Sequence, residues 1–199
     1  MVKLRKRITI PIDINGTVFS ADFLSFSGFN DEKEHIAIIF NKGDKEKIPL
    51  VRVHSECLTG DIFGSCRCDC GPQLNEALMR MCNVGGILIY MRQEGRGIGL
   101  YNKLDAYYLQ DAGYDTYQAN NLLGFENDLR DFSPAAEILK ALEIESIVLI
   151  TNNPEKVRQM QKNGIEISER KSTHTYLNAD NHKYLKAKMV KAGHSLKIK

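Results

Sequence analysis

Residues 52 to 71 read Arg52-Val-His-Ser-Glu-Cys-Leu-Thr-Gly-Asp-Ile-Phe-Gly-Ser-Cys-Arg-Cys-Asp-Cys-Gly71, and they hold four of the five cysteines of the chain. Ten residues separate Cys57 from Cys68, and one residue separates Cys68 from Cys70. Zinc prefers soft sulfur ligands and binds four ligands in a tetrahedral shell. The stretch therefore predicts a metal site.

The number of bound thiolates decides what kind of site this is. Four thiolates close the zinc shell, whereas three leave a position for water. In an extended run, Cys66, Cys68 and Cys70 would all point to one face. Cys66 could then join Cys57 in a closed, all-cysteine shell. Closed zinc ribbons usually carry two Cys-x-x-Cys pairs, which this chain lacks. Both a structural and a catalytic site remain open on the residues alone.

The composition is that of a globular protein of 199 residues, with 43% hydrophobic and 26% charged residues. The net charge of +2 is too small to indicate nucleic acid by itself. No apolar run approaches the roughly 18 residues of a membrane span, and the charged start lacks the apolar core of a signal peptide. We therefore expect a cytoplasmic protein with no nucleic-acid or membrane partner. Reducing conditions there favour metal binding over disulfides.

The secondary-structure pattern changes at the cysteine stretch. Four segments before it are rich in β-forming residues and predict an antiparallel sheet: 7–12, 17–24, 35–40 and 49–53. Asn15-Gly16 predicts a hairpin turn between the first two. After Gly71, apolar residues recur at helical spacing and predict a helix with a buried cysteine: Leu74, Ala77, Leu78, Met81 and Cys82.

A glycine-rich turn follows the apolar strand predicted at 86–90. It reads Arg92-Gln-Glu-Gly-Arg-Gly-Ile-Gly-Leu100 and leads into a helix predicted over 98–112. Backbone N–H groups and the dipole at such a helix start favour a phosphate. Arg92 and Arg96 flank the glycines and strengthen this interpretation. The alternative is a tight turn without a ligand.

A second turn of the same kind follows the strand predicted at 146–150. Thr151-Asn-Asn-Pro-Glu-Lys156 places a hydroxyl and a cation at the end of that strand, where open α/β sheets bind ligands. Ser133-Pro134 predicts a helix cap, with Ser133 as the N-cap and the helix over 135–142. A last strand at 165–167 and a terminal helix at 180–193 complete the pattern.

The expected fold class is α/β (α+β), an antiparallel β-rich N-terminal half joined to βαβ units in a single domain. Its parts are a β-rich segment over 1–54, a zinc loop over 55–71, an α/β segment over 72–170, and a C-terminal tail and helix over 171–199. Asp128 and Arg130 lie two residues apart, so they point to one side if the chain is extended there. They are either functional groups or an ion pair on a surface loop.

Six motifs occur together in a specific order, and with them the chain resembles GTP cyclohydrolase II from about residue 8 to about residue 196. The motifs are Arg52-Val-His-Ser-Glu-Cys-Leu-Thr-Gly-Asp61, Arg67-Cys-Asp-Cys-Gly71, Arg92-Gln-Glu-Gly-Arg-Gly-Ile-Gly-Leu100, Gln110-Asp-Ala-Gly-Tyr-Asp-Thr116, Asp128-Leu-Arg-Asp-Phe132 and Thr151-Asn-Asn-Pro154. That family performs the first committed step of riboflavin synthesis, as a hydrolase acting on a cyclic amidine.

The resemblance implies that GTP is converted to 2,5-diamino-6-ribosylamino-4(3H)-pyrimidinone 5′-phosphate with release of formate and pyrophosphate. It implies one Zn²⁺ per chain on Cys57, Cys68 and Cys70, Mg²⁺ with the triphosphate, and a homodimer. Position 66 is commonly apolar in the family, so Cys66 is a departure that could add a fourth ligand. Because a fourth sulfur would displace the water that zinc activates, we expect three.

The resemblance also implies three catalytic residues. Asp128 matches the proton acceptor, and Tyr107 matches a tyrosine near the reacting ring, although core packing is the alternative for it. Arg130 matches a nucleophile toward the α-phosphate. A guanidinium has a pKa above about 12, so stabilising the phosphoryl transition state is chemically the easier role.

The substrate contacts implied by the resemblance form a longer set. They are Arg52, Val53, His54, Ser55, Glu56, Gln73, Glu94, Gly95, Arg96, Thr116, Thr151 and Lys156. A carboxylate that accepts from guanine N1–H and the 2-amino group would exclude adenine. Glu94 is our candidate for that contact, and Glu56 is the rival.

Two other functions compete with the full reaction. A paralogue could stop at the formamide or act on another purine nucleotide, and formate released per GTP consumed separates that case. A nucleotide- or RNA-binding module, with a fold stabilised by zinc on four cysteines, would show no turnover.

Overall fold

The computed structural model describes residues 1–41, 48–126 and 128–182, and the chain divides into two compact units. The sheet unit comprises Met1–His54, Leu74–Arg92 and Phe132–Thr173. The cysteine unit comprises Ser55–Gln73, Gln93–Asp131 and the chain from His174 onward. The single domain expected over 1–199 stays a prediction.

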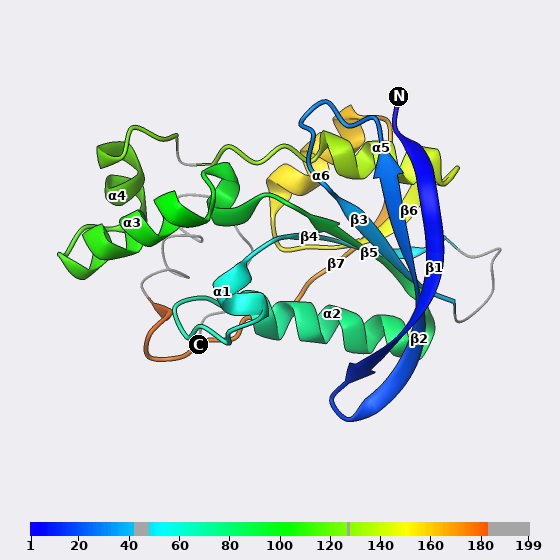
Figure 1. The fold of residues 1–199 in the computed structure, drawn as a ribbon, viewed down its shortest axis with the longest axis horizontal. Helices are drawn as coiled ribbons and strands as arrows, with labels where there is room; N and C mark the ends of the chain where they lie inside the picture. The colour runs from blue at the N-terminus through cyan, green and yellow to red at the C-terminus, as the bar shows by residue number, and fades with distance from the viewer. Residues whose placement is uncertain (42–47, 127, 183–199) are drawn as a thin grey trace. The chain divides into compact units, whose positions relative to one another are not determined.

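A seven-stranded sheet forms the sheet unit, with strand order β1-β2-β3-β5-β4-β6-β7 (Figure 1). The strands are β1 (Lys3–Ile14), β2 (Thr17–Ser27), β3 (Ile36–Phe40), β4 (Leu50–Ser55), β5 (Gly86–Met91), β6 (Ser146–Ile150) and β7 (Glu166–Lys171). Pairing is antiparallel from β1 through β2 and β3 to β5, and parallel from β4 through β6 to β7. The predicted mixed α/β class with a strand-rich N-terminal half is confirmed.

The hairpin between β1 and β2 turns at the predicted Asn15-Gly16 pair. Ile14 pairs with Thr17, which leaves two residues in the loop. Asn15 and Gly16 have φ values of 54° and 80°. Both are positive, as a type I′ turn requires, and the twist of that turn matches the twist of the strands.

Helices cover both faces of the sheet. The α2 helix (Cys70–Val84) packs on one face through Met81 and Cys82, next to Leu88 of β5. The α5 (Ser133–Ala141) and α6 (Pro154–Lys162) helices lie on the other face, where Ile87 and Ile89 contribute to the core (Figure 1). Side chains of β5 therefore alternate between two apolar layers, which explains its unbroken hydrophobicity.

The predicted cap of α5 is wrong by one position, and the predicted helix start at α6 is confirmed. Ser133 is the first residue of α5 and Phe132 occupies its N-cap, so the predicted Ser133 cap is wrong by one position. Phe132 is buried in the core, and its N–H donates to Gln159 Oε1 at 2.8 Å. At α6, Asn153 is the N-cap and accepts from Glu155 N at 2.9 Å.

The predicted strand at 165–167 is β7, which runs parallel to β6 after the α6 crossover.

Four short or medium helices build the described part of the cysteine unit. They are α1 (Leu58–Asp61), η1 (Glu94–Gly97), α3 (Leu100–Asp111) and α4 (Thr116–Leu122). The predicted helix over 98–112 is α3. The sequence pattern did not predict α4, which begins at a capping box made by Asp115 and Gln118. The terminal helix expected at 180–193 falls largely on residues 183–199, outside the described residues.

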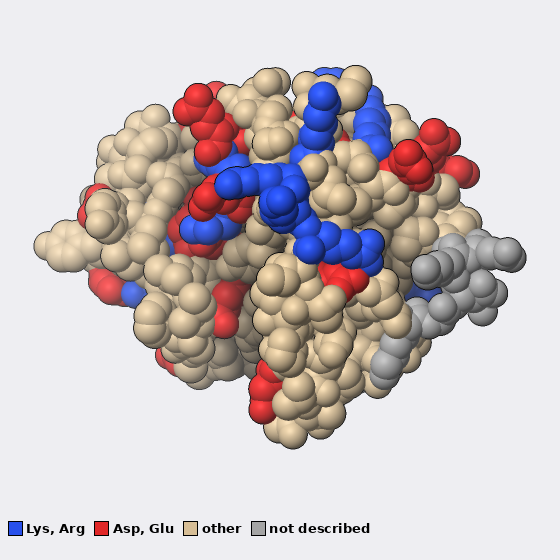
Figure 2. Space-filling model, turned by 45° about the vertical axis from the view of Figure 1, so that its right-hand side comes forward, with Lys and Arg blue, Asp and Glu red and all other residues tan. Residues whose placement is uncertain are grey.

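The surface carries both signs of charge. On the face drawn in Figure 2, Lys and Arg side chains lie among Asp and Glu side chains, in keeping with a net charge of +2. Within the described ranges, the model contains no helix long and apolar enough to cross a membrane.

Candidate functional site

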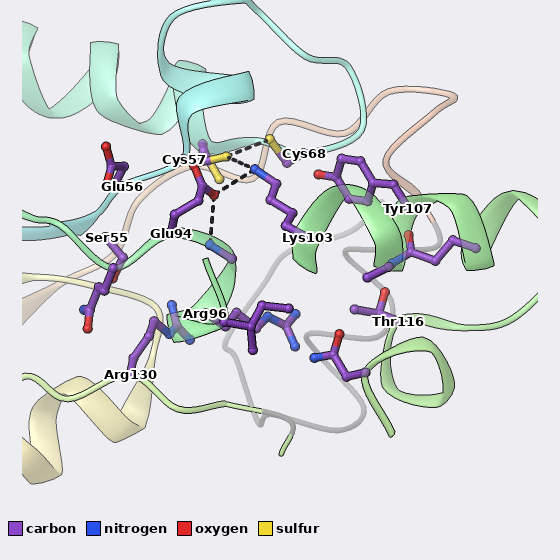
Figure 3. A pocket seen from close by; sticks show the side chains of 17 residues that line it. Ser55, Glu56, Cys57, Cys68, Glu94, Arg96, Lys103, Tyr107, Thr116 and Arg130 are labelled. Atoms are coloured by element: carbon purple, nitrogen blue, oxygen red, sulfur yellow. Dashed lines mark hydrogen bonds and ion pairs between the residues drawn. The ribbon is translucent and has the colours of Figure 1, made fainter. Parts of the chain in front are cut away.

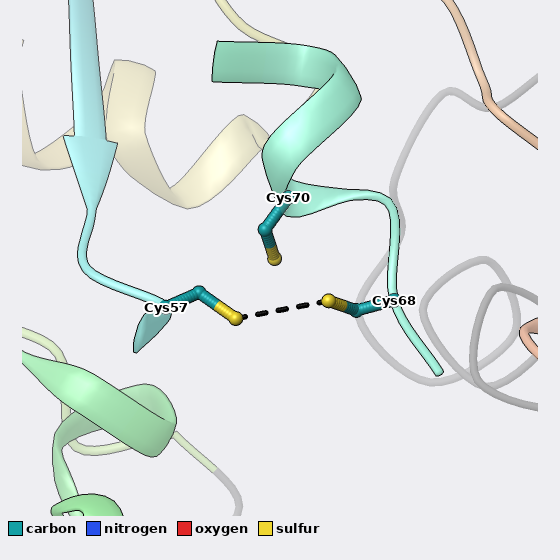
Figure 4. Close-up of side chains that lie close together, drawn as sticks. All are labelled: Cys57, Cys68 and Cys70. Carbon is teal, nitrogen blue, oxygen red and sulfur yellow. Dashed lines mark hydrogen bonds between the residues drawn. The ribbon is translucent and has the colours of Figure 1, made fainter. Parts of the chain in front are cut away.

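Three cysteine thiols converge in the cysteine unit (Figure 4). Cys57 is the N-cap residue of α1, Cys68 lies on the loop that follows, and Cys70 is the first residue of α2. Their sulfur atoms all lie within 4.8 Å of one another, and the Cys57 and Cys68 sulfurs are 3.7 Å apart. Two sulfurs that bind one zinc at about 2.3 Å in a tetrahedral shell would be about 3.8 Å apart, close to the separation of the Cys57 and Cys68 sulfurs. Cys57, Cys68 and Cys70 therefore fit a metal site with three thiolate ligands.

The backbone around the sulfurs leaves no room for another side chain at Gly60. A Cβ atom there would lie 2.7 Å from the Cys68 sulfur and 3.1 Å from the Cys57 sulfur. Such distances are well inside van der Waals contact. Gly60 therefore lets the α1 backbone pass directly beside the sulfurs.

Cys66 lies apart from this cluster. Its side chain is exposed, and its thiol donates to the carbonyl of Gly64 at 3.9 Å. The expectation that Cys66, Cys68 and Cys70 share one face assumed an extended run. Residues 66 and 67 instead form a turn, and Cys70 already belongs to a helix, so side chains do not alternate as they do in a strand.

Several neighbouring groups favour a thiolate at Cys57. A hydrogen bond from Cys68 is the largest of several effects that lower the pKa of Cys57, followed by one from Cys70. The same bond to Cys57 raises the pKa of Cys68 to about 11. The Lys103 ammonium, whose Nζ is 3.2 Å from the Cys57 sulfur, also favours a thiolate at Cys57.

A pocket opens beside the cysteines, and the residues that line it belong to the cysteine unit (Figure 3). Its lining includes the following residues expected from the sequence: Ser55, Glu56, Cys57, Cys68, Cys70, Glu94, Gly95, Arg96, Tyr107, Thr116 and Arg130. The structure therefore brings most of the predicted site residues of this unit together around one cavity.

The glycine-rich turn holds a strained backbone next to this pocket. Gly95 and Arg96 of η1 have φ values of 62° and 60°, in the left-handed region. For a residue with a Cβ atom that region costs about 1 kcal/mol. The Arg96 guanidinium lies 5.6 Å from the centre of the Tyr117 ring. The predicted turn between β5 and α3 is thus present, with a cation at its tip.

Glu94 already has three donors inside the protein. Its Oε2 accepts from Leu58 N at 2.6 Å, and its Oε1 accepts from Gly95 N at 2.8 Å and from Lys103 Nζ at 2.9 Å. The residue is only 8% exposed. Its carboxylate is therefore occupied in holding α1, η1 and α3 together.

Asp128 and Arg130 form the ion pair that their spacing suggested. Arg130 Nε donates to Asp128 Oδ1 at 2.8 Å. Partial burial raises the pKa of Asp128, but the hydrogen bonds and the charge of Arg130 outweigh this and lower it overall. Asp128 is thus a carboxylate near neutral pH. Arg130 lines the pocket beside the cysteines, whereas Asp128 lines a neighbouring hollow with Asn121 and Phe125.

Tyr107 is half-buried at the pocket wall and is not a core residue of α3. The guanidinium of Arg67 lies 4.3 Å from the centre of its ring. Arg67 also pairs with Asp111, at 2.9 Å from Nη1 to Oδ1. Arg67, between Cys66 and Cys68, therefore fixes the cysteine loop against α3 and stacks on the tyrosine.

Gln73 is the remaining expected residue of the cysteine unit. Its side-chain amide donates to Asp69 Oδ2, and its backbone N–H donates to the carbonyl of Asp69. These bonds stabilise the first turn of α2, which carries Cys70. Gln73 does not line the pocket beside the cysteines.

The other expected substrate contacts belong to the sheet unit, where β4 and the turn after β6 bring them together. Lys156 Nζ donates to Val53 O at 2.6 Å and lies 5.1 Å from the centre of the Phe132 ring. Arg52 donates to the carbonyl of Ile150 at 3.2 Å. His54 stacks on Tyr90 at 5.5 Å between ring centres, and the Thr151 hydroxyl accepts from Asn153 N at 3.0 Å. Arg52, His54, Thr151 and Lys156 are all buried.

The sequence reasoning missed Lys103. This lysine lies on α3 and is 7% exposed, and its ammonium reaches Cys57, Thr59 and Glu94. Burial alone lowers the pKa of Lys103, but the neighbouring Tyr107, Cys57 and Glu94 reverse this and raise it, so the side chain is charged. Its position three residues before the buried Ala106, on the same helix face, was the available signal.

Comparison with known proteins adds a family to this geometry. Residues 6–172 match the family described as GTP cyclohydrolase II. The chain is 54% identical over 199 residues to GTP cyclohydrolase-2 of Psychromonas ingrahamii, covering 100% of this chain and 99% of the relative. It is 52% identical over 199 residues to GTP cyclohydrolase-2 of Vibrio vulnificus, covering 100% of both chains.

Longer relatives also match. The riboflavin biosynthesis protein RibBA of Bacillus mycoides is 49% identical over 199 residues, which are 100% of this chain and 49% of that protein. Among solved structures, a two-domain 3,4-dihydroxy-2-butanone 4-phosphate synthase of A. baumannii is 19% identical with a TM-score of 0.45, over 87% of this chain and 40% of that one.

Proposed function

The chain belongs to the GTP cyclohydrolase II family of riboflavin biosynthesis, and from this premise we propose that it hydrolyses GTP in the first committed step of that synthesis. The imidazole ring of guanine opens, formate and pyrophosphate leave, and 2,5-diamino-6-ribosylamino-4(3H)-pyrimidinone 5′-phosphate remains. The observation that carries the proposal is the cluster of three sulfurs within 4.8 Å of one another, in the wall of a pocket that also contains Arg96, Tyr107 and Arg130.

Cys57, Cys68 and Cys70 are the residues that would hold one Zn²⁺ per chain. When bound with three thiolates, zinc supplies a Lewis acid that lowers the pKa of water. The protein contributes the shape of the site, through Gly60, and a second layer of donors around the sulfurs. The exposed Cys66 is left out of the proposed ligand set.

Asp128 is the proposed proton acceptor. The paired Arg130 keeps it ionised, so it is able to take a proton near neutral pH. Tyr107 is the proposed donor to the departing oxygen, because its ring lies at the pocket wall beneath Arg67. A general acid and a general base in one site each contribute typically 10²- to 10⁴-fold to a rate.

Arg130 is proposed to stabilise the negative charge that develops when the α-phosphate is cleaved. It lines the pocket and remains positive at any pH in the working range. A nucleophilic guanidinium would first have to lose a proton with a pKa above about 12. Mg²⁺ bound to the triphosphate would share the task of charge neutralisation.

The family resemblance supplies the proposed substrate contacts, which we give for each unit separately. In the cysteine unit, the contacts are Ser55, Glu56, Gln73, Glu94, Gly95, Arg96 and Thr116. In the sheet unit, they are Arg52, Val53, His54, Thr151 and Lys156. The carboxylate of Glu94 already accepts from three protein donors, and Glu56, which also lines the pocket, is the rival candidate for accepting from guanine N1–H and the 2-amino group.

We also propose a cytoplasmic location and a homodimeric assembly. All five cysteines are free thiols, as the reducing cytoplasm would keep them. A homodimer is the expectation from the family. Sedimentation equilibrium of the purified protein measures the mass directly, and a mass of about 22.5 kDa would mean a monomer.

Incubation of the purified protein with GTP and Mg²⁺ tests the proposal. We expect formate and a diaminopyrimidine product in proportion to the GTP consumed, and loss of both after treatment with a zinc chelator. Cys68→Ser serves as the matched variant, with Cys66→Ser as its control. Pyrophosphate without formate would indicate a paralogue that stops at the formamide. GTP binding without turnover would indicate a zinc-stapled binding module.

A further inference from the structure

Lys103 places a buried positive charge against the cysteine cluster. Its Nζ lies 3.2 Å from the Cys57 sulfur and 2.9 Å from Glu94 Oε1 (Figure 3). It also lies 2.8 Å from Thr59 Oγ1. An ammonium group has three N–H donors, so these contacts occupy all of them. The lysine is therefore engaged entirely within the protein and has no donor left for a phosphate.

The burial of this lysine calls for a specific reason. Lysine side chains on helices normally extend to solvent, and they are almost never fully buried unless paired. Lys103 is 7% exposed and pairs with Glu94, which is 8% exposed. Since an ion pair of this kind is weak evidence for stability, its position beside a sulfur suggests a functional reason.

We propose that Lys103 is a positioning residue of the metal centre, which donates a hydrogen bond to the Cys57 thiolate and offsets the negative charge of the three sulfurs. The inference rests on the proposed metal site and deepens it. Three thiolates and one divalent cation sum to one negative charge, and Lys103 supplies a positive charge 3.2 Å from one of the three sulfurs.

Glu94 connects Lys103 to the glycine-rich turn as well as to the helix that begins beside Cys57. The carboxylate that accepts from Lys103 also accepts from Leu58 N, next to Cys57, and from Gly95 N. Lys103 and Glu94 together thus connect α1, η1 and α3. A change at Lys103 is expected to move both the metal ligand Cys57 and the turn that carries Arg96.

A hydrogen bond to a metal-bound thiolate withdraws electron density from the sulfur. The metal then receives less charge and remains a stronger Lewis acid. Loss of such a partner typically costs 10- to 100-fold in metal affinity or activity. A lysine that only tied helices together would instead change stability and leave the metal–sulfur bonds as they were.

Cobalt substitution separates these two roles without any assay of turnover. Co²⁺ bound to thiolates absorbs through sulfur-to-metal charge transfer, and the energy of that band falls when a sulfur loses a hydrogen bond. We expect Lys103→Met to shift the band to longer wavelength and to weaken metal retention against a competing chelator by about 10- to 100-fold. Lys103→Arg should restore most of both, because it keeps the charge and the donor.

The control is Lys162→Met, the same replacement at an exposed position of α6, which should match the parent in both measurements. An unchanged band and unchanged chelator competition in Lys103→Met would overturn the proposal. If Lys103→Met does not fold, the double variant Lys103→Met/Glu94→Gln removes both buried charges. The cobalt band and the chelator competition are then measured on the double variant, and an unchanged result in both would overturn the proposal.

Failure of this inference is distinguishable from failure of the proposed function. If the parent protein releases no formate from GTP, the reaction is wrong, but the cobalt band and the chelator competition still report on Lys103. If the parent turns over GTP and the band is unaffected by Lys103→Met, only the role of Lys103 is wrong.

Discussion

At the residue scale, the cysteine cluster depends on the absence of one side chain. Gly60 has no Cβ, and an added one would approach the sulfurs of Cys68 and Cys57 to 2.7 Å and 3.1 Å. The neighbouring Gly64 has open space around it but a φ of +63°. A substitution at Gly60 thus introduces steric crowding, and one at Gly64 introduces backbone strain.

Gly60→Ala should lose most of its bound zinc, because the new methyl group displaces at least one sulfur. Gly64→Ala should keep its zinc and lose only about 1 kcal/mol of stability through the left-handed φ. Zinc per chain, measured by atomic emission after dialysis, distinguishes the two variants. Full zinc occupancy in Gly60→Ala would mean that the sulfurs do not lie as described.

Arg96 combines a strained backbone with a proposed contact to the triphosphate. Its φ of 60° suits glycine better than any residue with a Cβ atom. Arg96→Gly should therefore be more stable than Arg96→Ala by about 1 kcal/mol. Both should weaken nucleotide binding alike, since both lose the guanidinium.

Urea unfolding and nucleotide titration of the two Arg96 variants measure these effects separately. Equal stability of the glycine and alanine variants would show that the turn carries no strain in solution. Unchanged nucleotide affinity in both would remove Arg96 from the proposed substrate contacts.

Arg130→Lys tests whether the guanidinium is an electrostatic group or a nucleophile. A lysine keeps the charge but loses the fork that bonds Asp128 through Nε and Nη2. The electrostatic role predicts slower but measurable pyrophosphate release, reduced by about 10- to 1000-fold. Trapping of a phosphorylated arginine in the parent, with no pyrophosphate from Arg130→Lys, would support the nucleophile instead.

At the scale of elements, the β1–β2 hairpin is held by one carboxylate. Asp22 accepts from the Thr9 hydroxyl at 2.6 Å, from Arg7 Nε at 2.9 Å and from Asn41 Nδ2 at 2.7 Å. These hydrogen bonds, chiefly that of Thr9, lower the pKa of Asp22 from 3.8 to about 2. The ionised form is therefore favoured in the folded state.

The pH dependence follows from the direction of this shift. A lowered pKa contributes stability that is fully present above the unfolded value near 3.8 and is lost as the pH falls toward 2. Asp22→Asn should cost about 1 kcal/mol at pH 7, a figure reduced for the solvent exposure of Arg7, and progressively less toward pH 2.

Urea unfolding at pH 7 and at pH 2 to 3 measures this difference, with the exposed Glu166→Gln on β7 as the control. A difference between parent and Asp22→Asn that stays constant over the whole range would show that ionisation of Asp22 does not stabilise the hairpin.

Strands and long helices were readable from the sequence because their signals are local. Alternation and the Asn15-Gly16 turn fix β1 and β2, and spacing of apolar residues fixes α2. The cysteine ligand set needed tertiary information. Whether Cys66 joins depends on the turn at residues 66–67, which no periodicity reveals.

The buried pair of Lys103 and Glu94 was missed for a related reason. Charged residues on a helix and in a glycine-rich turn usually face solvent, and only the approach of α1 to both explains their burial. Contacts between residues distant in sequence thus decided the details that local patterns could not.

At the scale of the whole molecule, the family, the fold and the cysteine cluster agree. The similarity to two relatives named GTP cyclohydrolase-2 extends over all 199 residues of this chain, and the strand-rich half and the βαβ crossover were both expected. The account depends most on one feature, a metal held by three sulfurs with Cys66 excluded.

X-ray absorption at the zinc edge of the loaded protein tests that feature most directly. We predict three sulfur neighbours at about 2.3 Å and one lighter neighbour, with the same spectrum for Cys66→Ser. Four sulfurs in a preparation that is active on GTP, reduced to three by Cys66→Ser, would contradict the account.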